Sequence, residues 1–81
     1  MTIITNREHE VLKLIANGYS NEEILNTLVI AQATLKAHLH NLYKKLQVKR
    51  TSDNGSMRVR LALMYWQNKF SVKKKLHNQI T

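Results

Sequence analysis

The stretch Gln32–Val48, QATLKAHLHNLYKKLQV, decides the fold of this chain. Its leucines recur at spacings of four, three and four residues, which places them on one side of an α-helix: Leu35, Leu39, Leu42 and Leu46. The side turned away carries small, amide and cationic side chains: Lys36, Ala37, His40, Asn41 and Lys44. We therefore expect a helix whose leucines dock on a small core and whose other face is suited to a DNA groove.

The composition favours a single all-α domain. A chain of 81 residues buries one small core, and with no proline and only two glycines it has few helix breakers. The absence of cysteine excludes disulfides and thiolate metal sites. His38 and His40 are two residues apart on a helix and point in different directions, so we expect no metal site and no cofactor.

Positive charge is concentrated in the second part of the chain. Residues 1–30 carry two basic and four acidic groups (net −2), whereas residues 31–60 carry seven basic and one acidic (net +6). Residues 61–81 add four basic groups and no acidic one (net +4). This asymmetry favours a face that binds a polyanion. The alternative is a solvated lysine surface.

Apolar runs are too short for membrane insertion. No run approaches the ~20 residues of a membrane span, and Ile3-Ile4 is too short for the core of a signal peptide. We expect a cytoplasmic protein associated with the nucleoid.

Two capping boxes predict the first two helices, at about 6–17 and 21–28. Thr5 with Glu8, and Ser20 with Glu23, have the spacing at which a hydroxyl and a carboxylate satisfy the first backbone N–H groups. Gly18 is placed to leave the first helix in a left-handed conformation. A short turn then leads into the third helix, at about 32–47, and this succession is typical of a helix-turn-helix.

A fourth helix is predicted at about 57–70, capped by Ser56 after the turn signal Asp53-Asn54-Gly55. It carries two apolar stripes, of which one is needed to close the core. One stripe consists of Val59, Ala62, Leu63, Trp66 and Phe70; the other, which we expect to face a second copy or another partner, consists of Met57, Leu61, Met64 and Tyr65. The alternative is a helix buried on two sides within the monomer. We expect residues 1–70 to form the domain and residues 71–81 a basic tail that either aids solubility, which we favour, or adds a phosphate contact.

The ordered set of residues in "REHEVLKLIANGYSNEEI" and "TLKAHLHNLYKKLQV", at this separation, resembles the LuxR/NarL/GerE-type DNA-binding domain over roughly residues 4–50. The resemblance implies a four-helix domain whose third helix enters the major groove and whose fourth often mediates dimerisation. It implies base reading by Lys36, Ala37 and His40. It implies contacts to the DNA backbone by Asn21, Thr34, Asn41, Lys44 and Lys45.

The chemistry of these side chains fits the same reading. Lys36 can donate to guanine O6 and N7, the Ala37 methyl can meet a thymine methyl, and His40 can donate or accept at a base edge. Cations along and after this helix would neutralise phosphates: Lys44, Lys45, Lys49 and Arg50.

The chain departs from the family pattern at four places. Ala31 stands where a capping serine is usual, Leu25 replaces a small alanine, and Gln47 replaces the glycine after the third helix. The link 51–58 is longer than usual, which bears on the position of the fourth helix and on any family-like dimer. With no attached receiver or ligand-binding domain, the chain resembles stand-alone GerE-like members or a fragment.

Three functions follow, none of them enzymatic, because the sequence contains no paired carboxylates, Ser/His/Asp order or phosphate loop. The first is a sequence-specific transcription regulator that binds duplex DNA as a homodimer. The second is a protein-interaction module that binds another regulator or RNA polymerase through the fourth helix. The third is non-specific nucleoid or RNA binding, which predicts steep salt dependence without a preferred sequence.

Overall fold

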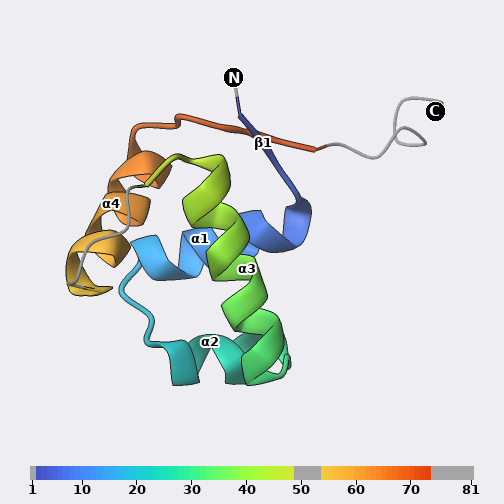
Figure 1. Ribbon diagram of the computed structural model, residues 1–81. Coiled ribbons are helices and arrows are strands. Elements are labelled where there is room, and N and C mark those ends of the chain that lie inside the picture. Colours follow the sequence, from blue (N-terminus) through green and yellow to red (C-terminus); the bar gives the residue numbers. More distant parts are fainter. Residues whose placement is uncertain (1, 49–53, 74–81) are drawn as a thin grey trace, which may run out of the picture.

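The computed structural model describes residues 2–48 and 54–73, and of residues 54–56 the backbone alone. Four helices and two very short strands follow one another in this part of the chain (Figure 1): β1 (Ile3–Ile4), α1 (Asn6–Ala16), α2 (Asn21–Leu28), α3 (Gln32–Lys45), α4 (Asn54–Trp66) and β2 (Ser71–Val72). A three-residue turn joins α2 to α3, as in a helix-turn-helix. The expected four-helix architecture is confirmed.

Both predicted capping boxes are present. The Thr5 hydroxyl accepts the Glu8 backbone N–H at 3.1 Å while a Glu8 carboxylate oxygen accepts the Thr5 N–H at 2.9 Å. Ser20 and Glu23 repeat this arrangement at 3.1 and 2.8 Å. Gly18, after α1, has a φ of +87°, which is the left-handed conformation expected at this position. Local sequence thus sets the start of α1 and α2.

The core lies where α1 packs against α3 and α4. Leu12 of α1 is fully buried, whereas Leu14 is only partly buried. Helix α2 contributes Ile24 in full and Leu25 and Leu28 in part. The α3 stripe is buried as predicted, with Leu39 partly covered.

Helix α3 ends two residues earlier than predicted. Gln47, where glycine is usual in the family pattern, adopts a left-handed φ of 57°. This conformation lets the Val48 N–H reach back to the Tyr43 carbonyl at 2.9 Å and stop the helix. At its other end α3 begins after Ala31, which makes no side-chain capping bond.

Helix α4 begins and ends earlier than the predicted 57–70. Asn54 and Gly55, interpreted as a turn, are helical, and Ser56 therefore lies within the helix rather than capping it. At the other end Asn68 adopts a left-handed φ of 57°, and the Lys69 N–H bonds to the Met64 carbonyl at 3.1 Å. Asparagine tolerates this conformation and here acts as the stop signal.

The two apolar stripes predicted for α4 largely exchange their expected roles, although Phe70, which lies beyond the helix, is buried in the core. Met57 and Leu61, expected at a partner surface, are 6% and 0% exposed, and Met64 and Tyr65 pack partly buried against the same core. The exposed side chains belong to the other stripe: Val59 at 59%, Leu63 at 50% and Trp66 at 63%. The predicted partner surface was therefore wrong. The face of α4 that carries Met57 and Leu61 packs against α1 instead.

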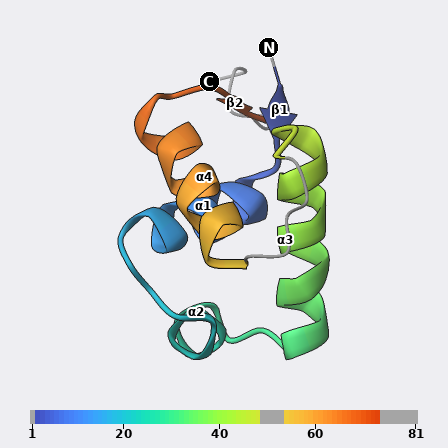
Figure 2. The same ribbon diagram turned by 60° about the vertical axis from the view of Figure 1, so that its left-hand side comes forward.

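The chain ends of the described fold meet in a parallel strand pair that the sequence did not predict. Ile3 pairs with Ser71 and Ile4 with Val72. The Ser71 N–H bonds to the Thr2 carbonyl, and the Lys73 N–H to the Ile4 carbonyl, both at 2.8 Å. This pair lies at the opposite end of the molecule from α2 (Figure 2). It joins the beginning of the predicted tail to the domain; residues 74–81 lie outside the described residues.

Candidate nucleic-acid interface

The exposed face of α3 is set by the leucines on its other side. Leu35, Leu42 and Leu46 are buried, which fixes the rotation of the helix about its axis. The predicted contact residues are then all turned to solvent: Thr34, Lys36, Ala37, His40, Asn41 and Lys44. No acidic residue lies anywhere in α3, so its field toward a polyanion is purely attractive.

The three predicted base-reading residues lie within little more than one helical turn. Lys36 and His40 are one turn apart on one line, and Ala37 lies beside Lys36. Lysine and histidine supply hydrogen-bonding groups, and the alanine leaves room for close approach to a base. His38, on the flank of this face, is partly buried.

Lys45 has a partner inside the protein. Its Nζ lies 2.8 Å from Oε1 of Glu8, whose side chain is only 4% exposed. Burial raises the pKa of Glu8, but the hydrogen bonds from Lys45 and from the Thr5 backbone and hydroxyl, with the Lys45 charge, outweigh burial and lower that pKa overall. The Lys45 charge is thereby matched, so Lys45 ties the end of α3 to the start of α1. This ion pair argues against the predicted phosphate contact of Lys45.

Asn21 is exposed at the first position of α2, and its side chain is held by a residue of α4. Arg58 donates from Nη1 to Asn21 Oδ1 and from Nη2 to the Tyr19 carbonyl, both at 2.6 Å. Sequence reasoning missed Arg58, because its partners are 37 and 39 residues away and no local pattern joins them. The other two predicted phosphate contacts, Lys49 and Arg50, lie outside the described residues.

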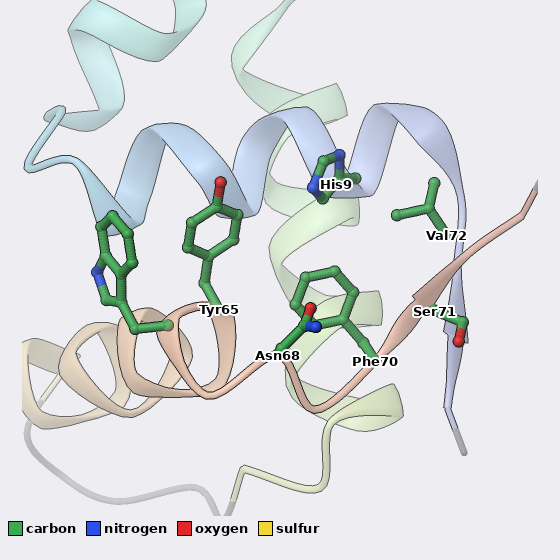
Figure 3. A pocket seen from close by; sticks show the side chains of 7 residues that line it. His9, Tyr65, Asn68, Phe70, Ser71 and Val72 are labelled. Atoms are coloured by element: carbon green, nitrogen blue, oxygen red, sulfur yellow. The ribbon is translucent and has the colours of Figure 1, made fainter.

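An open pocket of about 500 Å³ lies away from α2 and α3. Figure 3 shows His9 of α1 beside Phe70, with Tyr65 of α4 next to them. The centre of the His9 ring lies 6.0 Å from the centre of the Tyr65 ring and 5.7 Å from that of the Phe70 ring. Trp66, Asn68, Ser71 and Val72 complete the lining. The pocket therefore continues the exposed apolar stripe of α4, through Trp66, rather than the polar face of α3.

Other kinds of site are not formed within residues 2–48 and 54–73. No three His, Asp, Glu or Cys side chains in this part converge on a point where a metal ion could sit. None of its helices combines the length and apolar character that crossing a bilayer requires.

Comparison with known families agrees with this geometry. The family model described as bacterial regulatory proteins, luxR family, matches residues 2–57, which is more than half of the chain. The matched region contains α1, α2, α3 and the beginning of α4, and thus the helix-turn-helix with its exposed polar face. The family is one of non-enzymatic DNA-binding regulators of transcription. With a helix-turn-helix fold and an exposed cationic third helix, the chain belongs to the luxR family of bacterial regulatory proteins.

Proposed function

We propose that this protein is a sequence-specific transcription regulator that acts in the cytoplasm by inserting α3 into the major groove of duplex DNA. The observation that supports this most strongly is the exposed α3 face, which is free of acidic residues and whose rotation is fixed by buried leucines. A major groove about 12 Å wide admits one such helix.

Lys36, Ala37 and His40 read the bases in this proposal. The lysine donates to guanine O6 and N7, the alanine methyl contacts a thymine methyl, and the histidine bonds to a base edge. A well-made hydrogen-bonding contact of this kind discriminates by ~1–3 kcal/mol against a wrong base. Loss of either polar side chain therefore relaxes the preference at its own base pair and leaves the rest of the site intact.

Four residues hold the DNA backbone without reading sequence: Asn21, Thr34, Asn41 and Lys44. Lys44 carries the charge, so it contributes most of the salt dependence among these contacts. The hydroxyl and amide groups fix the register of α3 in the groove. Lys49 and Arg50, adjacent to α3 in sequence, extend the same set.

The protein is proposed to act as a homodimer that contacts its partner through α4. The surface for this contact is the exposed stripe Val59, Leu63 and Trp66, since these side chains are spaced on one helical face and at least half exposed. A two-fold axis through this stripe presents two α3 helices to two half-sites.

The experiment is a selection from random duplexes at ~0.15 M salt, where weak phosphate-only contacts are mostly lost. The wild-type protein is expected to enrich two related half-sites. Lys36→Ala and His40→Ala each relax the motif at one position in each half-site. Lys69→Ala, which removes an exposed cation outside α2 and α3, leaves it unchanged. Failure of the folded wild-type protein to enrich any sequence rejects the proposal.

The exposed α4 stripe also supports a second candidate, a module that binds RNA polymerase or another regulator. Charge reversal of Lys36 and Lys44 abolishes regulation if DNA reading is the function. If α4 recognises a protein partner instead, the same two charge reversals leave regulation intact, whereas Leu63→Glu abolishes regulation.

A further inference from the structure

Arg58 connects three parts of the structure that the DNA-binding proposal treats separately. It lies on α4, one residue beyond the end of the family match. Its guanidinium donates to the side chain of Asn21 at the start of α2 and to the Tyr19 backbone in the preceding loop. It also lies near Tyr43 of α3: burial raises the pKa of that phenol, and the Arg58 charge opposes the shift.

The geometry of the Arg58 fork determines what Asn21 can do. Nη1 bonds to the Asn21 side-chain oxygen, so the amide NH₂ of the same group is the end that remains for another acceptor. Two guanidinium nitrogens are used at once, on a side chain and on a carbonyl, and a planar fork of this kind fixes direction as well as distance. Asn21 is therefore held as a donor pointing outward from the first turn of α2.

The charge of Arg58 matters at the same place. The first turn of α2 carries Glu22 and Glu23, both exposed. These carboxylates interact favourably with the positive end of the helix dipole, but they repel a DNA phosphate that approaches the start of the helix. Arg58 is a cation 2.6 Å from Asn21, so it offsets that repulsion where the phosphate has to approach.

We propose that Arg58 is a positioning residue for DNA binding, which orients the Asn21 amide toward a backbone phosphate and offsets the charge of Glu22 and Glu23. The inference rests on the proposed function, because it assumes that Asn21 meets DNA. We assign Arg58 to positioning rather than to a direct phosphate contact, because the two hydrogen bonds that the structure shows for it are to Asn21 and to the Tyr19 carbonyl. Helix α4 thereby supports the helix-turn-helix through a residue that lies outside its exposed apolar stripe.

A double-mutant cycle tests this assignment on the duplex that the wild-type protein selects. Asn21→Ala is expected to lower the affinity for the duplex about tenfold, because it removes one charge-assisted hydrogen bond to a phosphate. Arg58→Gln is expected to lower it about fivefold, because Asn21 is no longer held. The double variant loses clearly less than the about fiftyfold expected of independent residues, since most of the Arg58 effect acts through the Asn21 contact. Arg60→Gln removes an arginine of the same helix that has no such bond and is the matched control.

Two further readouts separate positioning from a direct contact or a purely structural role. The salt slope of Arg58→Gln stays close to that of the wild-type protein, whereas loss of a direct phosphate contact reduces it by about one. A neutral methylphosphonate placed at successive DNA positions weakens wild-type binding at the Asn21 phosphate but has no further effect there on Arg58→Gln. Loss of stability alone would not produce this position-specific result. If Arg58→Gln does not fold, Arg58→Lys, which keeps the charge, replaces it in the cycle. Its affinity for the duplex is expected to fall about threefold.

The outcomes distinguish this inference from the proposed function. Three outcomes would overturn the role of Arg58 while DNA reading by α3 stands. They are additive losses of affinity in the double variant, unchanged affinity of both Arg58 variants, and a salt slope of Arg58→Gln that is reduced by about one. If the wild-type protein selects no duplex, the proposed function and this inference fall together.

Discussion

Replacement of Ala31 by serine should stabilise the protein by supplying the cap that α3 lacks. The chain contains two natural references, because Thr5 and Ser20 occupy the same cap position with φ and ψ of −77° and 165°, and −75° and 166°. Ala31 has nearly the same backbone, at −76° and 156°, and is exposed, so a serine fits without rearrangement. Only the side-chain oxygen is missing.

The magnitude follows from one hydrogen bond. In α1 and α2 the capping hydroxyl accepts a backbone N–H at 3.1 Å, and in α3 the equivalent donor is the N–H of Thr34. An alanine-to-serine change at such a site is worth about 1 kcal/mol. Thr34 is not a glutamate, so the reciprocal half of the box is absent and no larger gain is expected. For a domain of this size the melting temperature rises by roughly 4–8 °C.

Thermal and urea unfolding followed by circular dichroism measure this gain. The control is Ala33→Ser, which places the same hydroxyl inside the first turn of α3, where it cannot cap. Ala33→Ser is expected to be neutral or slightly destabilising. If Ala31→Ser is no more stable than the wild-type protein, or if both variants gain equally, the argument from the uncapped helix start is refuted.

Three more predictions concern the ion pair, the end of α3 and the apolar stripe. Glu8→Gln should cost about 2 kcal/mol at neutral pH by leaving Lys45 without its partner. Because the folded-state pKa of Glu8 is lowered, its contribution is complete above the ordinary value of 4.5 and disappears as pH falls through the lowered pKa, so urea unfolding should show the two proteins converging in acid. Gln47→Gly should raise stability by about 0.5–1 kcal/mol in the same assay, since glycine adopts the left-handed φ without strain; an equal or lower stability would show that Gln47 is unstrained. Leu63→Glu should convert a dimer to a monomer in sedimentation equilibrium without lowering the melting temperature, whereas a wild-type protein that is already monomeric when bound to DNA contradicts the α4 interface.

The parts of the fold that could be predicted are those that depend on residues close in sequence. A hydroxyl and a carboxylate three residues apart are sufficient to mark the starts of α1 and α2. The α3 leucines at helical spacing are sufficient to give both the helix and its exposed face. For this reason the positions of Lys36, Ala37 and His40 on that face followed from periodicity.

Helix α4 shows where a pattern is insufficient. Both of its stripes have helical spacing, and both are apolar, so periodicity alone does not say which one faces α1. The helix also includes Asn54 and Gly55, which favour a turn locally, because burial of Met57 and Leu61 against the core stabilises the helical conformation more. Asn68, in contrast, is a recognisable stop signal, because asparagine tolerates the left-handed φ that ends the helix.

The remaining differences come from contacts between residues far apart in the chain. The family resemblance and the basic character of α3 both predict a phosphate contact for Lys45, yet its partner Glu8 is 37 residues earlier. The strand pair between Ile3–Ile4 and Ser71–Val72 joins the two ends of the described fold, and two-residue strands carry no recognisable pattern. The Arg58 bridge to Asn21 is of the same kind. Only the tertiary structure brings these groups together.

The most direct test of the central claim is a titration of ¹⁵N-labelled protein with the selected duplex, followed by amide chemical shifts. Insertion of α3 into the groove predicts the largest changes along Thr34–Lys44 and at Asn21. The amides of Val59 and Leu63, on the α4 stripe, should change little when the protein is dimeric before DNA is added. Changes centred on α4, or spread evenly over exposed lysines with none at His40, would contradict the account.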